Sequence, residues 1–385
     1  MDEKIERKIE DFKVPKGKQL IARVVLEFAA ITGVGVFLLG RYVWDKSQLP
    51  YQRGFYCDDE NLKHPFLPET ISEKACGMIW VVIGLIVIPA IEFAHFKVFR
   101  YEAWEKAIER RGGIISRLRG VPAFLLELYR ICGYFLVGLL VCLVTTQIAK
   151  YQVGRLRPYF LSACNIDLTD ELCKDKFGYQ KFVQINNTQC RGPWVDPGTG
   201  DSSWNNESSD YDWIFKACEG KSEKECIEDI MNEGRKSFMS GHSSFSFYCA
   251  AFFIIYLHSR LSYETPFGSR KQKEGTVGFR IFLRGLKALR PFLQFLFFII
   301  AFWVALTRIK DYRHHPLDVV TGTIVGIVFS GLVLFGIIDI FNRPRSFTSY
   351  DAKYIRYKEN TESSRNDITE ISEVDGKNKV SKKPL

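Results

Sequence analysis

The chain has 385 residues, of which 46% are hydrophobic and 14% aromatic, and its formal net charge is +9 at pH 7. The hydrophobic residues form long runs that are apolar on every side. This argues against a soluble protein, because a helix of a soluble core usually keeps a polar face. The runs do not alternate between polar and apolar residues, which argues against a membrane β-barrel. The basic residues lie mainly beside the runs, so we attribute the positive charge to membrane topology and not to nucleic-acid binding.

Six of these runs have the length of about 20 residues that a helix needs to cross a bilayer. They lie near residues 20–41, 77–97, 123–149, 244–262, 288–307 and 319–341. The fourth is the shortest. The first is not a cleaved signal peptide, because it is too long and follows a charged segment. The runs therefore predict an all-α integral membrane protein with six transmembrane helices.

Lys and Arg residues near the ends of the runs predict the orientation of the chain. They concentrate in the N-terminal tail (1–19) and in the second and fourth connections (98–121 and 260–287). Because basic loops stay in the cytosol, we place these segments there, together with the C-terminal tail (342–385). The membrane domain between the tails (20–341) then has its first, third and fifth connections on the non-cytosolic side.

The third connection, about residues 150–243, is very long and has two features of a non-cytosolic segment. Asn186 and Asn206 each begin an N-x-[ST] acceptor for glycans. Five cysteines also lie there: Cys164, Cys173, Cys190, Cys218 and Cys226. Cys57 and Cys76 lie in or beside the first connection, and an oxidising compartment would allow disulfides. Five cysteines cannot all pair with one another, so one pairs elsewhere or stays free, and the connectivity stays open. We expect a glycoprotein with disulfides.

The C-terminal tail is polar, and its section from Glu359 to Asp375 is acidic and rich in Ser and Thr. Such a composition predicts disorder, because it cannot bury enough apolar surface to fold. Lys382 and Lys383, close to the end, resemble a dilysine signal for retrieval to the endoplasmic reticulum. A solvated, lysine-rich tail is the simpler interpretation of the same residues.

Three short polar segments interrupt the membrane pattern. They are KYQVGRLRP (150–158), SFMSGHSS (237–244) and TRIKDYRHHPLD (307–318). The predicted topology places all three on the non-cytosolic face, although the runs were identified without reference to them. Together the segments form the candidate functional site.

Five residues of these segments suit a phosphate group. Lys150, Arg157 and Arg308 are cations, and Arg presents a planar fork that matches phosphate oxygens while Lys acts as a point charge. Ser240 and Gly241 lie where a helix is expected to begin. Free backbone N–H groups at such a position bind anions, and Gly allows close approach. We predict that these residues hold a phosphate.

Two histidines supply the chemistry that a phosphate ester needs. Asp318 follows His314 by four residues, with Pro316 between them. Proline favours the first turn of a helix, so the sixth helix is expected to start near His315 or Pro316. At this spacing Asp318 would accept from one ring nitrogen of His314 and leave the other free as a nucleophile. His242 would protonate the leaving group. The set is that of a phosphomonoesterase.

Two other interpretations concern the same segments. A basic residue at a membrane surface is often an anchor that snorkels to the interface, and this interpretation fits Arg155 and Arg313. His242, His314 and Asp318 would also suit a divalent metal. Three nearby cations oppose a metal, and the segments offer few carboxylates. We therefore expect no metal and no cofactor.

The three motifs resemble a known family. Lys-x6-Arg-Pro, Ser-Gly-His and Arg-x5-His-x3-Asp, in this order, resemble the phosphatidic acid phosphatase type 2 superfamily. PYQRGFYCDDENLKHPF, KYQVGRLRPYF, SFMSGHSSFS and DYRHHPLDV are similar to the integral-membrane lipid phosphate phosphatases of animals, from about residue 20 to 341. Met239 stands where the superfamily often has Pro, and Thr307 where it often has Ser. The third connection, through about 160–235, is longer than the resemblance leads us to expect.

The resemblance implies a role for each motif residue. His314 matches the nucleophile that forms a phosphohistidine, Asp318 its partner carboxylate and His242 the general acid. The phosphate-binding set is Lys150, Arg157, Ser240, Gly241 and Arg308. The family works without a metal on phosphatidate, lysophosphatidate, sphingosine 1-phosphate and ceramide 1-phosphate. The resemblance gives His315 no role.

Two other classes of function stay open at this stage. A non-catalytic relative of the same fold would bind lipid or partner proteins, although such relatives lose motif residues that are present here. A transporter would use charged residues inside the spans, for which Glu92, Glu127 and Arg130 are candidates. We expect the plasma membrane with the catalytic face outward, with the endoplasmic reticulum or Golgi as alternatives. The sequence leaves a homo-oligomer open.

Overall fold

The structure is a computed structural model. It describes residues 17–46, 48–99, 123–196, 198–200, 202–204, 211–262 and 277–338. Most of the N-terminal tail, Asn206, the C-terminal tail and Lys382 with Lys383 therefore lie outside the described residues, and the expectations for them stay predictions.

The chain divides into two compact units. The larger one contains residues 27–88 and 131–338, and the smaller one contains residues 1–26, 89–130 and 339–385. All three polar segments of the candidate site belong to the larger unit. The fold and the site described below are those of the larger unit.

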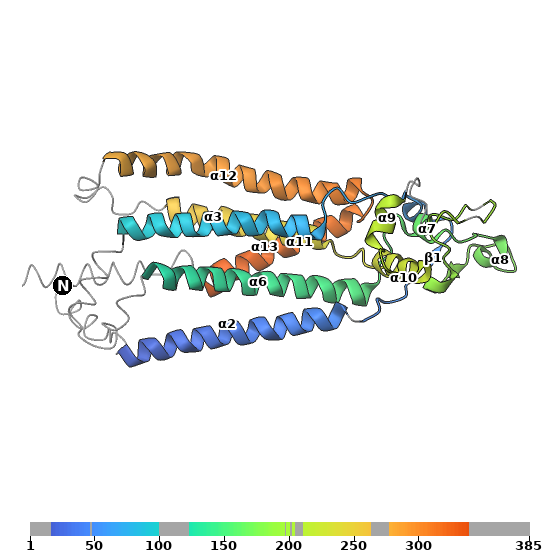
Figure 1. Ribbon diagram of the computed structural model, residues 1–385, viewed down its shortest axis with the longest axis horizontal. Helices are drawn as coiled ribbons and strands as arrows, with labels where there is room; N and C mark the ends of the chain where they lie inside the picture. Colours follow the sequence, from blue (N-terminus) through green and yellow to red (C-terminus); the bar gives the residue numbers. More distant parts are fainter. Residues whose placement is uncertain are drawn as a thin grey trace, which may run out of the picture. The chain divides into compact units, whose positions relative to one another are not determined.

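Long helices form most of the larger unit, and the first three of them also include residues of the smaller one. The long helices are α2 (Gly17–Lys46), α3 (Glu73–Phe99), α6 (Ala123–Val153), α11 (Gly241–Ser262), α12 (Val277–Lys310) and α13 (Pro316–Gly331), which the turns of η4 (Leu332–Ile337) extend. Within the larger unit these helices run side by side, and the short elements gather at one end of them (Figure 1). The helical prediction is confirmed for each of the six runs.

Four helices are long and apolar enough to cross a membrane, among the residues that the structure describes. These spans are Glu73–Phe93, Leu128–Val153, Ala288–Lys310 and Pro316–Ile337. In α2 only the shorter stretch Ala29–Arg41 is apolar, and α11 is not among the four. Helix α11 packs mainly on α12 and α13, and its Phe252 and Phe253 are completely buried. Its surroundings are protein, so it tolerates the polar residues of its first turns. An integral membrane protein is confirmed, and six spans stay a prediction.

The first and third connections fold together into a cap at one end of the helices. Its short elements are β1 (Phe55–Tyr56), η1 (Glu60–Leu62), α7 (Phe160–Cys164), α8 (Asp170–Cys173), β2 (Phe182–Val183), η2 (Asn187–Gln189), α9 (Asp212–Ala217) and α10 (Glu223–Gly234). Strands β1 and β2 pair antiparallel, with Phe55 opposite Val183. Phe160, Trp194 and Met231 contribute to a hydrophobic core of the cap's own. In the residues that the structure describes, the fold is therefore helical apart from one small pair of strands.

Three disulfides close the cap. They join Cys57 to Cys173, Cys164 to Cys190 and Cys218 to Cys226, with Cα atoms 5.8, 4.5 and 5.6 Å apart. These separations lie within the usual range for disulfides. The expectation that one cysteine of the third connection pairs elsewhere is confirmed, because Cys173 bonds to Cys57 of the first connection. Cys76 stays a free, buried thiol.

Two glycines bring the starts of α11 and α13 into contact. A Cβ atom at Gly322 would lie 2.5 Å from the carbonyl oxygen of Ser240, and one at Gly326 would overlap that of Ser244. Glycines four residues apart let two helices cross closely in this way. The backbone N–H of Ser240 donates to the carbonyl of Asp318 at 3.1 Å. The crossing therefore joins two of the three polar segments.

Candidate active site

His314 lies in the turn between α12 and α13 and is 3% exposed. Its Nδ1 lies 2.6 Å from the backbone carbonyl oxygen of Ser237. A carbonyl oxygen only accepts, so Nδ1 carries the proton and Nε2 keeps its lone pair. The ring is therefore held in the tautomer that a nucleophile at Nε2 requires.

Asp318 supports this arrangement through Ser237 and not directly. Its fully buried carboxylate accepts from the hydroxyl of Ser237 at 2.6 Å and from Arg155 Nη1 at 2.7 Å. It also accepts from the backbone N–H of His315 at 3.2 Å, which caps α13 at Pro316 as predicted. The four-residue spacing predicts a direct hydrogen bond from His314 to Asp318, and this prediction is wrong. Capping of its own helix turns the carboxylate towards Ser237, and a serine carbonyl takes the ring proton instead.

The three predicted cations surround the two histidines. Arg157 and Lys150 act electrostatically on His314, as does His242. Arg308, Lys150 and Arg157 act on His242. All three cations are buried. The structure thus brings together side chains from α6, α11 and α12 that lie far apart in the sequence.

The start of α11 lies against Lys150. A Cβ atom at Gly241 would lie 3.4 Å from Lys150 Nζ. The hydroxyl of Ser240 is fully buried and accepts from the hydroxyl of Ser243 at 3.0 Å. The first N–H groups of a helix have no acceptor within the helix. The predicted anion-binding turn therefore opens beside a lysine ammonium group.

Carboxylates lie beside two of the arginines that are predicted to bind phosphate. Arg157 Nη2 lies 3.3 Å from Glu233 of α10. Arg308 lies 3.2 Å from Asp311 and 3.7 Å from Glu69 of the first connection. Acidic side chains from both connections thus partly neutralise the cations.

Nε2 of His242 and Nε of Arg157 are buried and have no hydrogen-bond partner among the described residues, and the same holds for Nε of Arg313. Buried polar atoms of folded proteins almost always have a partner, so a pair of unsatisfied ones marks a place for an oxygen-rich ligand. A phosphate group would satisfy those of His242 and Arg157.

The metal interpretation fits the donor set poorly. Both oxygens of Asp318 are occupied, by Arg155 on one side and by Ser237 on the other. Within the described part of the chain, His, Cys, Asp and Glu side chains form no group of three that would hold a metal ion. The residues present fit an anion.

Burial, together with the charges of Arg157 and Lys150, lowers the pKa of His314 well below its ordinary value. A second positive charge among buried cations is unfavourable, so the ring stays neutral. A neutral ring retains the lone pair at Nε2. The electrostatics and the hydrogen bond to Ser237 therefore favour the same form of His314.

The sequence does not predict the contribution of two residues to the site, and it suggests the wrong role for two arginines. Ser237 and Glu69 carry no local signal, because their partners lie far away in the sequence. The interpretation of Arg155 and Arg313 as surface anchors is wrong. Arg155 pairs with buried Asp318, and Arg313 is 7% exposed and donates to the carbonyl of Leu67 at 2.7 Å.

Two further predicted features lie near the site. His315, which had no role, contacts the carbonyl oxygen of Leu156 at 3.0 Å through Nε2 and so ties the first polar segment to the third. Asn186 is exposed on the cap, as a glycan acceptor must be, and its glycosylation stays a prediction.

Comparison with known proteins gives a consistent result. The family model described as the PAP2 superfamily matches residues 132–337. A provisionally named phosphatidate phosphatase of Drosophila melanogaster is 30% identical over 86% of this chain and 72% of its own. Phospholipid phosphatase 1 of Rattus norvegicus is 29% identical over 77% of this chain and 79% of its own, and phospholipid phosphatase 2 of Homo sapiens is 28% identical over 77% of each. No solved structure matches. The chain belongs to the PAP2 superfamily, in the branch of the animal lipid phosphate phosphatases.

Proposed function

We propose that the chain hydrolyses lipid phosphates through a phosphohistidine at His314, without a metal, at the non-cytosolic face of the membrane. Its family and the names of its relatives make it a phosphoric monoester hydrolase of the phosphatidate phosphatase type. The substrates that we infer are phosphatidate, lysophosphatidate, sphingosine 1-phosphate and ceramide 1-phosphate. The acyl chains would stay in the bilayer while the phosphate enters the site at the ends of the spans.

One observation carries the proposal. His314 donates Nδ1–H to the carbonyl of Ser237, and its other nitrogen remains available near the buried cations Arg157 and Lys150. A fixed, neutral imidazole in a positive site is what in-line attack on a phosphate requires. A structural histidine would use both of its nitrogens in hydrogen bonds or packing.

The first chemical step would transfer the phosphoryl group to the enzyme. Nε2 of His314 forms a bond to phosphorus while the bond from phosphorus to the lipid oxygen breaks. Burial and the charges of Arg308 and Lys150 lower the pKa of His242 to about 3 without substrate, and the negative charge of the bound phosphate raises it. His242, protonated in this complex, gives its proton to the departing oxygen, so that the lipid leaves as an alcohol. Lys150, Arg157 and Arg308 balance the charge on the remaining phosphoryl oxygens.

The second step would release the phosphate. Water attacks phosphorus, the bond from phosphorus to Nε2 breaks, and neutral His242 takes a proton from the water. Orthophosphate leaves, and His314 returns to its neutral form with its proton still on Nδ1. The buried link from Asp318 through Ser237 holds the ring in place during both steps.

The experiment measures phosphate release from the four lipid phosphates in detergent micelles with excess chelator. We expect release by the wild type and none above background by His314→Ala. His258→Ala is the matched control, because His258 is an exposed histidine at the other end of α11. An acid-labile radioactive phosphate on the wild-type protein, absent from His314→Ala, would identify the intermediate. Full release by folded His314→Ala would contradict the assignment. No release by folded wild type would favour a non-catalytic lipid-binding protein.

A further inference from the structure

A groove lies beside the candidate active site, at the ends of α6 and α13. Its volume is about 720 Å³. The first connection contributes Arg53, Tyr56 and Asp59, and the third contributes Arg155 and Phe182. The catalytic set does not line it, because neither His314 nor His242 is among its wall residues. The groove is therefore a separate site.

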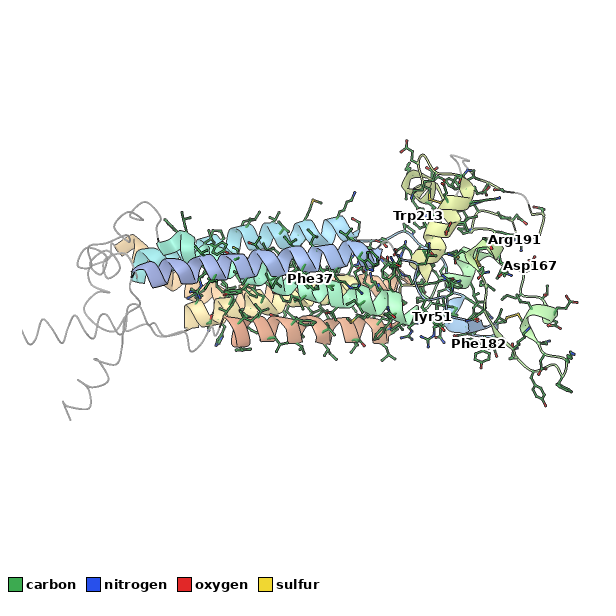
Figure 2. The ribbon with its side chains drawn as sticks, turned by 90° about the horizontal axis from the view of Figure 1, so that it is seen from below. Phe37, Tyr51, Asp167, Phe182, Arg191 and Trp213 are labelled. Atoms are coloured by element: carbon green, nitrogen blue, oxygen red, sulfur yellow. A yellow bond between two sulfur atoms is a disulfide. The ribbon has the colours of Figure 1, made fainter. Side chains whose placement is uncertain are left out.

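The groove lies at the depth of lipid headgroups. Val153, in its wall, is the last residue of one candidate span, and Pro316 is the first residue of another. Phe182, also in its wall, lies just beyond the ends of the long helices (Figure 2). The boundary of the hydrocarbon core therefore falls at the base of the groove.

The charges of the groove favour a monoanion. Its charged wall residues are Arg53 and Arg155, which are positive, and Asp59, which is negative. The Arg53 side chain is exposed, and no described residue pairs with it. Arg155 gives Nη1 to Asp318, but its side chain is still 32% exposed. Asp318 engages Arg155 from the side of the active site, so Arg53 is the unpaired guanidinium of the wall, which matches a singly charged phosphodiester better than a dianionic phosphomonoester.

Polar and apolar groups on the wall suit the rest of a lipid. Asp59 accepts from the backbone and side-chain N–H groups of Asn61 through Oδ1, and its other oxygen is available to a hydroxyl. The rings of Tyr56 and Phe182 meet edge to face at 5.3 Å, and Leu317 is 67% exposed. Aromatic and aliphatic side chains at this level contact glycerol and the first part of acyl chains.

We propose that this groove binds a second phospholipid, which is not hydrolysed and which has a monoanionic phosphodiester and a polyol headgroup. Its phosphate lies between Arg53 and Arg155, its headgroup hydroxyls donate to Asp59, and its chains run down past Leu317. The proposed nucleophile His314 does not line the groove, and Nε2 of His315, which does, is engaged by the carbonyl oxygen of Leu156, so the lipid stays intact. Guanidinium groups bind phosphate through several N–H donors at once, which makes two arginines the main determinant.

The lipid would also act on catalysis, and this part rests on the proposed function. Arg155 is bonded to Asp318, Asp318 to Ser237, and Ser237 to His314. A phosphodiester on the outer face of Arg155 fixes the guanidinium in the position in which it holds Asp318. The lipid would therefore be an activator.

The binding test uses the full-length protein in neutral detergent micelles with phosphatidylglycerol or phosphatidylcholine, and retained lipid is counted by native mass spectrometry. We expect the wild type to retain phosphatidylglycerol in preference. Arg53→Ala should weaken this binding about tenfold, which corresponds to one charge-assisted hydrogen bond. Lys216→Ala, which removes an exposed positive charge elsewhere on the cap, should retain it as the wild type does. Equal retention of both lipids by the wild type, or an unchanged Arg53→Ala, would overturn the proposal.

The activity test varies the fraction of phosphatidylglycerol at a fixed surface concentration of lysophosphatidate. We expect the rate of the wild type to rise about fivefold or more, since coupling free energies between sites are typically 1 kcal/mol or larger. Arg53→Ala should keep the rate without phosphatidylglycerol and lose the rise. A wild type that retains the lipid but releases no phosphate would contradict the proposed function and leave the groove assignment intact. A wild type that is active but does not respond would contradict the coupling.

Discussion

The imidazole Nδ1 of His314 donates to the backbone carbonyl of Ser237 across 2.6 Å. A backbone carbonyl cannot be removed by changing a side chain, so the tautomer of the ring does not depend on any single carboxylate. The side chain of Ser237 makes a different bond, to Asp318. The two bonds can therefore be tested separately.

Ser237→Ala removes the bond to Asp318 and keeps the carbonyl for His314. We expect the specific activity to fall by between about 10- and 100-fold, the loss of one hydrogen bond to a buried charge, while His314→Ala loses all activity. Steady-state rates with lysophosphatidate give the comparison. Ser162→Ala, whose hydroxyl only contacts the carbonyl of Lys63 on the cap, is the control and should keep the wild-type rate. An equal loss of activity in Ser237→Ala and Ser162→Ala would contradict this role of Ser237.

Arg155 and Asp318 should behave as one unit in unfolding experiments. We expect Arg155→Met and Asp318→Asn to destabilise the protein less in combination than the sum of their separate effects, with a coupling of about 1.5 kcal/mol or more. The reason is that either single change leaves an unpaired group beside a buried site. The exposed pair of Lys216 with Asp212 should show a coupling of about 0.3–0.5 kcal/mol. Additive effects in the Arg155 cycle would show that the pair is not coupled.

Protonation of His314 should set an acid limit on the activity. Burial and the charges of Arg157 and Lys150 lower its pKa, and the neutral ring is the reactive form. The acid limit that His314 sets on the activity therefore lies below about pH 6.5, the ordinary pKa of histidine. Arg157→Gln removes one of these positive charges, so the pKa of His314 should rise. The acid limit of the variant's activity should therefore move towards neutral pH. The dependence of kcat/KM on pH, measured with one substrate for both proteins, shows this shift without interference from the ionisation of the substrate. A shift in the acid direction would contradict the electrostatic assignment.

The same lowered pKa predicts how stability changes with pH. Below about 6.5 the unfolded chain takes up a proton on His314 that the folded protein excludes, so the free energy of unfolding falls as the pH falls. Thermal unfolding of wild type and His314→Gln between about pH 5 and about pH 7, around the ordinary pKa of histidine, measures this contribution. The variant should lose less stability over that range.

Glu69 should compete with phosphate for the arginines. Its carboxylate lies 3.7 Å from Arg308 and 3.4 Å from Arg313. Glu69→Gln removes a negative charge next to the site, so orthophosphate should inhibit about three- to tenfold more strongly. Glu60→Gln, which removes a charge paired with Lys63 on the surface of the same connection, should leave inhibition unchanged. Weaker inhibition of Glu69→Gln would show that the glutamate positions the arginines and does not compete.

The disulfide between Cys57 and Cys173 should contribute more to stability than that between Cys218 and Cys226. The first closes a sequence separation of 116 residues and the second one of 8. In the chain-entropy account these correspond to about 5 and about 2.5 kcal/mol. Thermal unfolding of the two double Ser variants tests the order. A smaller drop in Tm for the Cys57 and Cys173 variant would contradict it.

Local patterns revealed the parts of the fold and site that depend on neighbours in the sequence. Apolar runs located the helices, and Pro316 located the start of α13. The three motifs gave the cations and histidines that the fold brings together. Local patterns of this kind do not show which residues far apart in the sequence contact one another in the fold. The spacing of His314 and Asp318 is right for a contact on one helix face, but His314 precedes the helix and Ser237, from another segment, lies between them. The partner of Cys173 is likewise set by the packing of two connections and by no local signal.

The disulfide between Cys57 and Cys173 also constrains how the chain inserts into the membrane. Helices α3 and α6 lie between the two cysteines in the sequence, and each contains a candidate span. Two thiols can join only within one compartment, so the chain must cross the membrane an even number of times between them. A polypeptide in which only one of these helices had inserted would hold the cysteines on opposite sides, and the bond could not form. Oxidation of this pair therefore requires that both helices have inserted into the membrane.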